Sequence, residues 1–325
     1  MMQKLIYMIG IPGSGKSEMA KQIAKKEKAI ILSTDELRQT LFFNVNKQKR
    51  TNLLYMELYK RANRLLAEGK SVLIDVTNIE RERRMKALNK FVDVHKECYY
   101  MDVPYEVCVD RNNKRKRVVE DRILVKMRKN LDFPLKNEGW DIIHTIHEPF
   151  SYEMTKEELT NLLVSEVSYE ELFDKLNKVP FFQAMECFDQ ENPFHSMTLC
   201  QHTYGLIEYI NEMYEEKDKL ILQMAALFHD VGKVFCKTYK VTKGYYSYFG
   251  HEKVSSQIAF HFLTELRFED EFIQAVVGII EMHMLINYDG NEGATKIYHL
   301  LGDELLAKLY FFREADMNFV PSLKL

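Results

Sequence analysis

The residues whose types and spacing most clearly suggest chemistry lie near the start of the chain, in the segment GIPGSGKS at residues 10–17. Its spacing fits the pattern G-x-x-x-x-G-K-[ST], in which glycines let backbone N–H groups turn inward around phosphate oxygens. An apolar run enters the segment and a helical pattern leaves it, so a helix would present its positive end to an anion. We therefore expect six residues to bind a nucleoside triphosphate: Gly10, Gly13, Ser14, Gly15, Lys16 and Ser17.

The last two of these residues have more specific expected roles. In a loop of this kind Lys16 reaches the β- and γ-phosphates of ATP, and the hydroxyl of Ser17 joins the coordination shell of Mg²⁺. The alternative is a chance glycine turn before a helix. The order of strand, loop and helix favours the phosphate-binding interpretation.

Acidic side chains follow the second and third apolar runs of this half. Asp35 follows one run and is placed to activate an incoming hydroxyl for phosphoryl transfer, while Arg38 shares its helix face and could hold a phosphate of the acceptor. The alternative for Asp35 is a helix N-cap, because Ser-Thr-Asp is ordinary capping chemistry. Asp75 ends another run, where an Mg²⁺ ligand and a solvated strand end are equally good interpretations.

A dense basic segment, RNNKRKR, occupies residues 111–117. We interpret it as a lid whose arginines close over the triphosphate during transfer, with Arg111 and Arg115 four residues apart on one helix face. A solvated charged face is the alternative interpretation.

Histidines and aspartates form a second group of candidates in the other half of the chain. They lie on or beside apolar helical stripes: His202, His229, Asp230, His251, His283 and Asp316. A single buried histidine is more often structural than a ligand, but several of them with two aspartates favour a metal site. Imidazole and carboxylate groups suit Mn²⁺, Fe, Co²⁺, Ni²⁺ or Zn²⁺. His195 could line the same site or serve as a cap or core residue, whereas we interpret His261 and His299 as structural.

The elements that position these residues differ between the two halves. Short apolar runs alternate with helical stretches and predict a parallel sheet with helices on its faces: Leu5–Ile9, Ala29–Leu32, Val72–Ile74, Cys98–Met101 and Ile142–Ile146. Such sheets place their chemistry at the carboxyl ends of the strands. From Phe181 the stripes have a helical period only. We expect one domain over residues 1–148, a helical connector over residues 149–180 and an all-α domain over residues 181–325.

Bulk composition limits the class of protein. The chain has 325 residues, of which 46% are hydrophobic and 29% charged, with a net charge of −3, so we expect a globular protein that does not coat nucleic acid generally. Five scattered cysteines without a C-x-x-C pair suggest reduced thiols. The chain begins directly with the first apolar run, and no apolar run approaches the roughly 20 residues of a membrane span. We therefore expect a cytoplasmic protein with no signal peptide and no membrane partner.

The motifs of the first half, taken in order, resemble a known family. GxPGSGKS, STDELR, DVTNIERERR and RNNKR together are similar to the kinase domain of bacteriophage-type polynucleotide 5′-kinases and related nucleotide-dependent kinases, over about the first 147 residues. The resemblance implies that Asp35 activates the 5′-hydroxyl of RNA or DNA, that Arg38 contacts the 3′-phosphate, and that Arg111 and Arg115 belong to the lid. Small-molecule kinases share much of this layout, so other acceptors stay open.

The second half resembles the HD metal-dependent phosphohydrolase superfamily, especially the HD domains attached to some tRNA nucleotidyltransferases. The order H…HD…H…H…D, with HDVGK and YFGHEKV, carries the resemblance over roughly residues 190–318. It implies a first metal bound by four residues: His202, His229, Asp230 and Asp316. His251 and His283 would recruit a second ion or the phosphate, and Lys233 would contact the phosphate.

Together the resemblances predict an α/β P-loop kinase domain, with helices on both faces of its parallel sheet, followed by an all-α HD domain. The pairing is similar to bifunctional end-healing enzymes, which phosphorylate a 5′-hydroxyl end and remove phosphate from a 3′-phosphate end, a 2′,3′-cyclic phosphate end or a nucleotide. Two alternatives stay open: a small-molecule or nucleotide kinase fused to an HD nucleotidase, and an ATP-binding switch that regulates the HD domain. The choice of metal, the number of metals, and a homo-oligomeric state are left open by the sequence.

Overall fold

The computed structural model divides the chain into two compact units, residues 1–148 and 149–325. It describes residues 3–42, 51–186, 188–191, 197–288 and 290–318. His195 and one of the five cysteines, Cys187, lie outside these ranges. The other four cysteines are buried free thiols. Each unit is described by itself below.

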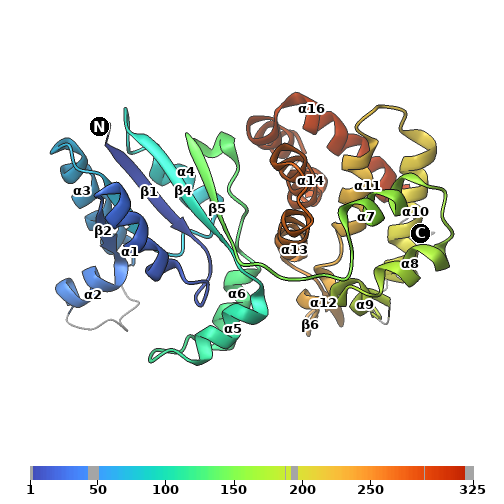
Figure 1. Cartoon of the computed structure of the whole chain (residues 1–325), viewed down its shortest axis with the longest axis horizontal. Coiled ribbons are helices and arrows are strands. Elements are labelled where there is room, and N and C mark those ends of the chain that lie inside the picture. Colours follow the sequence, from blue (N-terminus) through green and yellow to red (C-terminus); the bar gives the residue numbers. More distant parts are fainter. Residues whose placement is uncertain (1–2, 43–50, 187, 192–196, 289, 319–325) are drawn as a thin grey trace. The chain divides into compact units, whose positions relative to one another are not determined.

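The first unit is built on a parallel sheet of five strands in the order β2-β3-β1-β4-β5 (Figure 1). Their bounds are β1 Lys4–Ile9, β2 Ile30–Ser33, β3 Val72–Asp75, β4 His95–Asp102 and β5 Ile142–His147. All five apolar runs expected from the sequence are strands, and the α/β class is confirmed. β1 lies in the middle of the sheet, where Leu5 to Ile9 are fully buried, because a central parallel strand is covered on both faces.

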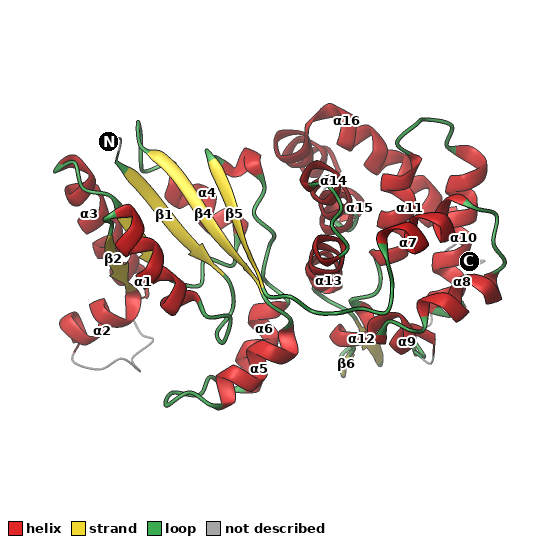
Figure 2. Ribbon diagram, in the orientation of Figure 1, coloured by secondary structure: helices red, strands yellow, loops and turns green. Residues whose placement is uncertain are grey.

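Helices connect these strands and flank the sheet (Figure 2). Their bounds are α1 Lys16–Glu27, α2 Thr34–Phe42, α3 Thr51–Ala67, α4 Arg81–Leu88, α5 Tyr105–Asn113 and α6 Asp121–Arg128, with a short 3₁₀ turn at Lys136–Glu138. Since β1, β3 and β4 are parallel neighbours, the loops after them meet at one edge of the sheet.

A buried ion cluster fixes the loop after β3. Arg84 is fully buried and bonds the carboxylate of Glu138 through Nε at 2.7 Å and Nη2 at 2.6 Å. Arg81 Nε bonds the same carboxylate at 3.0 Å, and the Trp140 indole donates to it at 3.2 Å. The arginines of the DVTNIERERR motif that are buried here therefore hold the fold, because an unpaired buried charge is costly.

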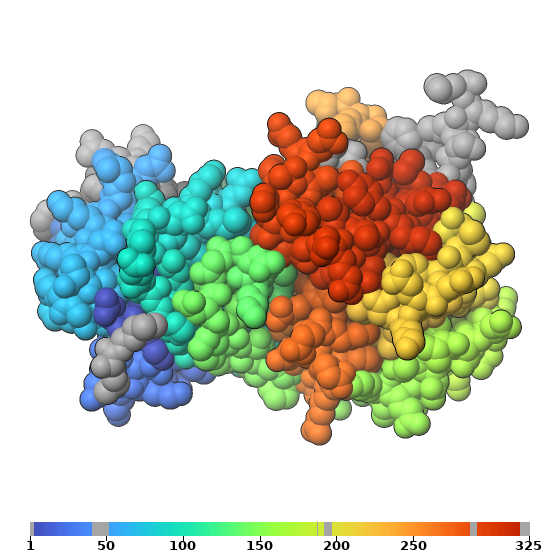
Figure 3. Space-filling view, turned by 90° about the horizontal axis from the view of Figure 1, so that it is seen from above, coloured from blue at the N-terminus to red at the C-terminus, as the bar shows by residue number. Residues whose placement is uncertain are grey.

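The second unit is a helical bundle. Its helices are α7 Lys156–Val164, α8 Tyr169–Leu176, α9 Pro180–Glu186, α10 Leu199–Met213, α11 Lys219–Phe228, α12 Lys233–Cys236, α13 His251–Glu265, α14 Asp270–Met282, α15 Leu285–Tyr288 and α16 Gly290–Asn318. The helices α7 and α8, which lie in the expected connector, belong to this unit. Helices α14 and α16 pack together and lie on the face that Figure 3 shows in orange-red and red. A non-helical residue, Gly302, kinks α16.

Aromatic rings form the centre of this unit. Phe262 of α13 lies 5.7 Å from the Phe228 ring of α11 and 5.3 Å from the Phe181 ring of α9. Tyr152, which precedes α7, lies 4.7 Å from the Phe262 ring. The helical period expected from Phe181 onward therefore corresponds to helices that bury their apolar side chains in this centre.

One element of the second unit does not follow the helical expectation. Strands β6 (Thr238–Lys240) and β7 (Tyr245–Ser247) form an antiparallel hairpin between α12 and α13.

Among the described residues of both units, none of the helices combines the length and the apolar character that a membrane span requires.

Candidate active sites

The phosphate loop follows β1 and leads into α1. Gly13 has a φ of 86°, and a Cβ there would lie 2.1 Å from the carbonyl oxygen of Cys108, so only glycine fits. Gly15, at φ 85°, is the N-cap of α1. Gly10 donates its N–H to the carbonyl of Thr77, and Ser14 is buried. The loop therefore has the backbone conformation that a strand–loop–helix anion site requires.

Lys16 lies inside this loop, with only 9% of its surface exposed. Its Nζ donates to the carbonyl of Ile11 at 2.7 Å and lies 3.5 Å from Ser14 Oγ. Burial lowers its pKa to about 8, although the charge of Asp75 acts in the opposite direction. An ammonium held in a desolvated loop favours an anionic partner such as a phosphate.

Ser17 and Asp75 occupy the positions around Lys16. Ser17 is exposed in the first turn of α1, and Asp75 is half-buried at the end of β3. Asp75 is the carboxylate that influences the Lys16 pKa most. A hydroxyl and a carboxylate at one sheet edge fit the oxygen ligands that Mg²⁺ prefers.

Asp35 lies in the first turn of α2 with most of its side chain exposed. Arg38 Nη1 is 3.2 Å from Asp35 Oδ1, as the three-residue spacing predicted. The capping role belongs to Ser33, whose hydroxyl accepts the Glu36 N–H at 3.1 Å. A second guanidinium, that of Arg117, lies 3.5 Å from the same carboxylate oxygen. Arg117 belongs to the basic segment expected to form a lid, but its contact with Asp35 was not predicted.

The basic segment differs from its expected form. Helix α5 ends at Asn113, so Arg111 lies on the helix but Arg115 lies in the turn beyond it, and the expectation of one shared helix face is wrong. Arg111 pairs with Glu148 at 2.9 Å. Arg115 is exposed, and its charge acts on the Lys16 pKa. The buried Asn112 side chain closes the turn through both hydrogen bonds with Val119.

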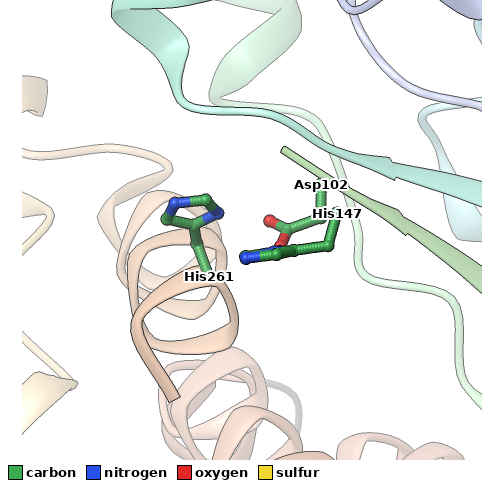
Figure 4. Close-up of side chains that lie close together, drawn as sticks. All are labelled: Asp102, His147 and His261. Carbon is green, nitrogen blue, oxygen red and sulfur yellow. The ribbon is translucent and has the colours of Figure 1, made fainter. Parts of the chain in front are cut away.

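A pair that the sequence analysis missed lies at the ends of two neighbouring strands. His147 Nδ1 of β5 lies 2.5 Å from Asp102 Oδ2 of β4 (Figure 4). Both are the last residues of their strands and are register partners. Strand-end position was therefore the signal that could have found them.

The candidate metal residues of the second unit form two groups. His202, His229 and Asp316 form one, and Asp230, His251 and His283 form the other; within each group the ligand atoms lie within 4.8 Å of one another. His202 Nε2 is 2.9 Å from Asp316 Oδ1, and His229 Nε2 is 3.7 Å from the same oxygen. These residues come from α10, α16 and the end of α11.

The carboxylate of Asp230 joins the two groups. Its Oδ2 lies 3.4 Å from His229 Nε2, and its Oδ1 lies 3.2 Å from His251 Nε2. His251 Nε2 is 3.3 Å from His283 Nε2. If the site holds divalent ions, Asp230 would be available as a ligand to both sets of imidazoles.

Backbone carbonyls orient three of these rings from behind. The Nδ1 atoms of His229, His251 and His283 donate to the carbonyls three residues earlier: Ala226 at 2.9 Å, Tyr248 at 3.0 Å and Ile280 at 2.6 Å. Because a carbonyl oxygen can only accept, Nδ1 carries a proton and the lone pair of a neutral ring is on Nε2. Three Nε2 atoms are thus prepared as metal ligands.

The donor set fits a divalent cation. His229 Nε2 is buried and has no hydrogen-bond partner among the described residues. Burial and the neighbouring histidines lower the pKa of His283 to about 3, so this ring is neutral at pH 7. Its lone pair faces His251 Nε2, and two such nitrogens repel unless a proton or a metal ion lies between them.

The carboxylates of the site are ionised. Burial raises the pKa of Asp316, but the His202 hydrogen bond and the His229 charge outweigh it and lower the pKa to about 2. Burial also raises the pKa of Asp230, but the neighbouring groups, chiefly the charge of Lys233, together lower it by more. The pKa of Asp230 is therefore well below its usual range. Burial alone would lower the pKa of His229. Asp230 and Asp316 together have the larger, opposite effect, so the pKa of His229 is raised above its usual value.

The HDVGK sequence is explained by packing as well as by charge. Lys233 Nζ lies 2.6 Å from Asp230 Oδ2 and is buried. A Cβ on Gly232 would lie 2.3 Å from the carbonyl oxygen of His251, because the start of α13 approaches closely. Gly232 N–H also donates to Ser255 Oγ at 2.8 Å.

Two further histidines were expected to be structural. His261 projects from α13 (Figure 4), and His299 is exposed.

Family models match both units. Residues 5–134 match the AAA domain model, and residues 199–309 match the HD domain model. The two matched ranges agree with the P-loop and HD resemblances of the two halves of the chain. A curated protein, the CC-adding tRNA nucleotidyltransferase of Thermus thermophilus, is 30% identical over 122 residues, which are 38% of this chain and 28% of that protein.

Solved structures show only partial similarity. A Pnkp1/Rnl/Hen1 complex has 23% identity and a TM-score of 0.32 over 37% of this chain and 40% of that chain. A gluconokinase from Sinorhizobium meliloti has 18% identity and a TM-score of 0.34 over 44% of this chain and 81% of that chain. This chain thus spans under half of the first structure and about a quarter of the curated relative.

Proposed function

We propose that this chain, which joins an AAA-type P-loop kinase domain to an HD domain, prepares nucleic-acid ends with two reactions. The first unit transfers phosphate from ATP to a 5′-hydroxyl end of RNA or DNA. The second unit removes phosphate from a 3′-phosphate end, a 2′,3′-cyclic phosphate end or a nucleotide. The observation that carries the proposal most directly is the convergence of three carbonyl-oriented histidines on the Asp230 carboxylate in the second unit, in a chain whose first unit contains a complete phosphate loop.

In the kinase reaction, the loop amides and Lys16 hold the phosphates of ATP, and Ser17 and Asp75 hold its Mg²⁺. Asp35 accepts the proton of the attacking hydroxyl, since its carboxylate is exposed and follows β2 at the catalytic edge. Arg38 binds a phosphate of the acceptor. Among the lid arginines, Arg115 is exposed and Arg111 must leave Glu148 to reach the nucleotide.

In the hydrolytic reaction, the two imidazole–carboxylate groups would hold one or two divalent ions, and such ions would supply an acidified water and neutralise phosphoryl charge. His202, His229 and Asp316 orient one side of the site, and His251 and His283 the other, with Asp230 shared. Lys233 contacts the substrate phosphate, for which it must exchange its pairing with Asp230.

The kinase reaction is tested by transfer of labelled γ-phosphate from ATP to 5′-hydroxyl oligonucleotides. Wild type should label RNA or DNA, and Lys16→Ala should abolish labelling, whereas Lys21→Ala on the exposed face of α1 should retain it. Labelling of mononucleotides or small hydroxyl compounds with no labelling of oligonucleotides would indicate a small-molecule kinase. ATP binding without transfer to any acceptor would indicate a switch module.

The hydrolytic reaction is tested with Mn²⁺, Co²⁺, Ni²⁺, Fe²⁺ or Zn²⁺ added to metal-free protein. Phosphate release from 3′-phosphate or 2′,3′-cyclic ends should require metal and should disappear in His229→Ala/Asp230→Ala. Activity that survives this double substitution would refute the assignment of the site.

A further inference from the structure

The segment between Asp230 and His251 is basic and rich in aromatic residues. Residues 231–250 contain four lysines, six aromatic residues and no acidic residue, although the chain as a whole has a net charge of −3. The two ends of this segment adjoin residues of the HD site. A basic, aromatic segment is therefore attached to both sides of a site built for phosphate chemistry.

The structure exposes this composition on a hairpin. Strands β6 and β7 pair only with each other in the part of the chain that the structure describes, and β6 lies next to α12 in Figure 2. Tyr239 is 51% exposed, Val241 85% and Phe249 75%. Lys240 and Lys243 are also exposed. Large apolar side chains that lie in water beside lysines indicate a surface that receives a partner.

The base of the hairpin is anchored, so its outer residues are displayed from a fixed support. Lys237 Nζ bonds Glu191 at 2.6 Å and lies 4.6 Å from the centre of the Tyr246 ring. The buried Tyr248 hydroxyl donates to the carbonyl of Gln190. Tyr239 packs edge-on against Tyr246 with ring centres 5.2 Å apart. This anchoring reduces the ordering cost of binding on the outer face.

We propose that this hairpin arm, residues 238–249, holds a single-stranded nucleic acid whose end enters the HD site. The inference rests on the proposed phosphohydrolase function and names its substrate as a polynucleotide end. Bases stack on Tyr239 and Phe249, and Lys240 and Lys243 pair with the strand's phosphates, which is the usual combination in single-strand binding surfaces.

The position of the hairpin arm next to the HD site favours a nucleic-acid strand over other anionic ligands. Phe249 is two residues from His251, so their Cα atoms are separated by roughly 7 Å at most. In the proposed mode, a strand whose base stacks on the exposed Phe249 ring continues from there toward the buried His251. A mononucleotide has no second base or phosphate to occupy Tyr239, Lys240 and Lys243.

The first experiment measures binding without turnover. Fluorescence anisotropy of a labelled, 5′-phosphorylated single-stranded decanucleotide is followed in EDTA with the full chain and with Tyr239→Ala/Lys240→Ala/Lys243→Ala. We expect at least tenfold weaker binding by the variant and a salt slope that is smaller by about 1.4, because each phosphate contact to a single strand contributes about 0.7. The control variant Tyr298→Ala/Lys217→Ala removes an aromatic residue of matched exposure, 52%, and an exposed lysine elsewhere in the same unit. It should bind as wild type does.

Equal binding by wild type and the hairpin variant would overturn the proposal, whatever the hydrolytic activity. So would binding to anionic lipid vesicles that the hairpin substitutions abolish while oligonucleotide binding persists.

The second experiment compares two substrates with the same reactive group, a decanucleotide with a 2′,3′-cyclic phosphate end and adenosine 2′,3′-cyclic phosphate. The hairpin substitutions should lower kcat/KM for the decanucleotide at least tenfold more than for the mononucleotide, mainly through KM. Equal losses on the two substrates would contradict the inference and leave the phosphohydrolase intact. If neither substrate is hydrolysed, the proposed hydrolysis of cyclic ends fails, and the binding measurement still decides the role of the hairpin.

Discussion

The two candidate active sites hold their reactive side chains in opposite environments. In the second unit, His229, Asp230 and His283 are at most 3% exposed, and backbone carbonyls fix the rings before any ligand arrives. In the first unit, the phosphate loop is formed, but the Asp35 side chain is 60% exposed and is shared by Arg38 and Arg117.

The difference follows from what each site must bind. A metal ion is small and needs several ligands at fixed distances, so buried and oriented groups are an advantage. A kinase must admit a nucleotide and an acceptor, and its lid arginines act only when substrates are present. We expect the first site to be completed by its substrates and the second by its metal alone.

The largest expected effect concerns the preassembled site. His229→Ala should lower metal-dependent phosphate release by about a thousandfold or more, which corresponds to roughly 4 kcal/mol of transition-state stabilisation. The same variant should transfer phosphate from ATP at the wild-type rate. His299→Ala, which removes an exposed histidine of α16, should change neither rate. Calorimetric titration with Mn²⁺ checks whether metal binding is lost with the activity.

At the open site, loss of activity should occur without loss of stability. Asp35→Asn should lower phosphoryl transfer by about 10²- to 10⁴-fold, because the amide cannot accept a proton from the hydroxyl. The melting temperature should not change, since the side chain is largely exposed. Glu36→Gln is the matched control at the next position and should be fully active. A large fall in melting temperature for Asp35→Asn would mean that this carboxylate supports the fold instead.

In the preassembled site, a substitution that disturbs the packing should lower both the stability of the second unit and its metal binding. Gly232→Ala should destabilise the second unit by about 3 kcal/mol, because its Cβ would overlap the carbonyl of His251. It should also weaken metal binding by displacing that ligand. Gly244→Ala meets no atom within 4 Å but has a φ of +73°, so it should cost only about 1 kcal/mol. Urea unfolding and metal titration of both variants measure the two effects.

The smallest expected effect is a dependence of stability on pH. Because the pKa of Lys16 is about 8 in the fold and 10.5 in the unfolded chain, the buried ammonium destabilises the fold below pH 8, and the penalty is relieved as pH rises from 8 to 10.5. Without nucleotide, Lys16→Met should therefore be more stable than wild type at pH 7, by about 1 to 3 kcal/mol at 1.36 kcal/mol per pKa unit.

The advantage of Lys16→Met should shrink toward zero by pH 10.5, and urea unfolding at the two pH values measures it. A constant difference would show that the ammonium is already compensated within the loop.

Much of the fold was readable from the sequence, because local pattern and tertiary environment agree. The runs Leu5–Ile9 and Val72–Ile74 are continuously apolar and buried, as central strands covered on both faces must be, and all five expected runs are strands. The hairpin at residues 238–247 was missed because its strands are only three residues long, with β6 exposed and β7 half-buried. A helical period cannot predict an element that buries so little.

The chemical groups could also be predicted from the sequence, because residue type and spacing identify a phosphate loop and a set of histidines and aspartates. The contacts between these groups in three dimensions could not be predicted. That Arg117 reaches Asp35, that Asp230 faces both histidine groups, and that α5 ends before Arg115 depend on turns whose geometry residue type does not encode.

The sequence by itself therefore determined which atoms could act on phosphate and which elements carry them. The tertiary structure alone decided which of those atoms meet. It placed a proton on Nδ1 of three rings by directing each to a backbone carbonyl, and it buried Arg84 against Glu138 while Arg115 stays exposed. The physical reason is that burial and hydrogen-bond geometry are properties of the packed chain, whereas residue type and spacing are properties of its order.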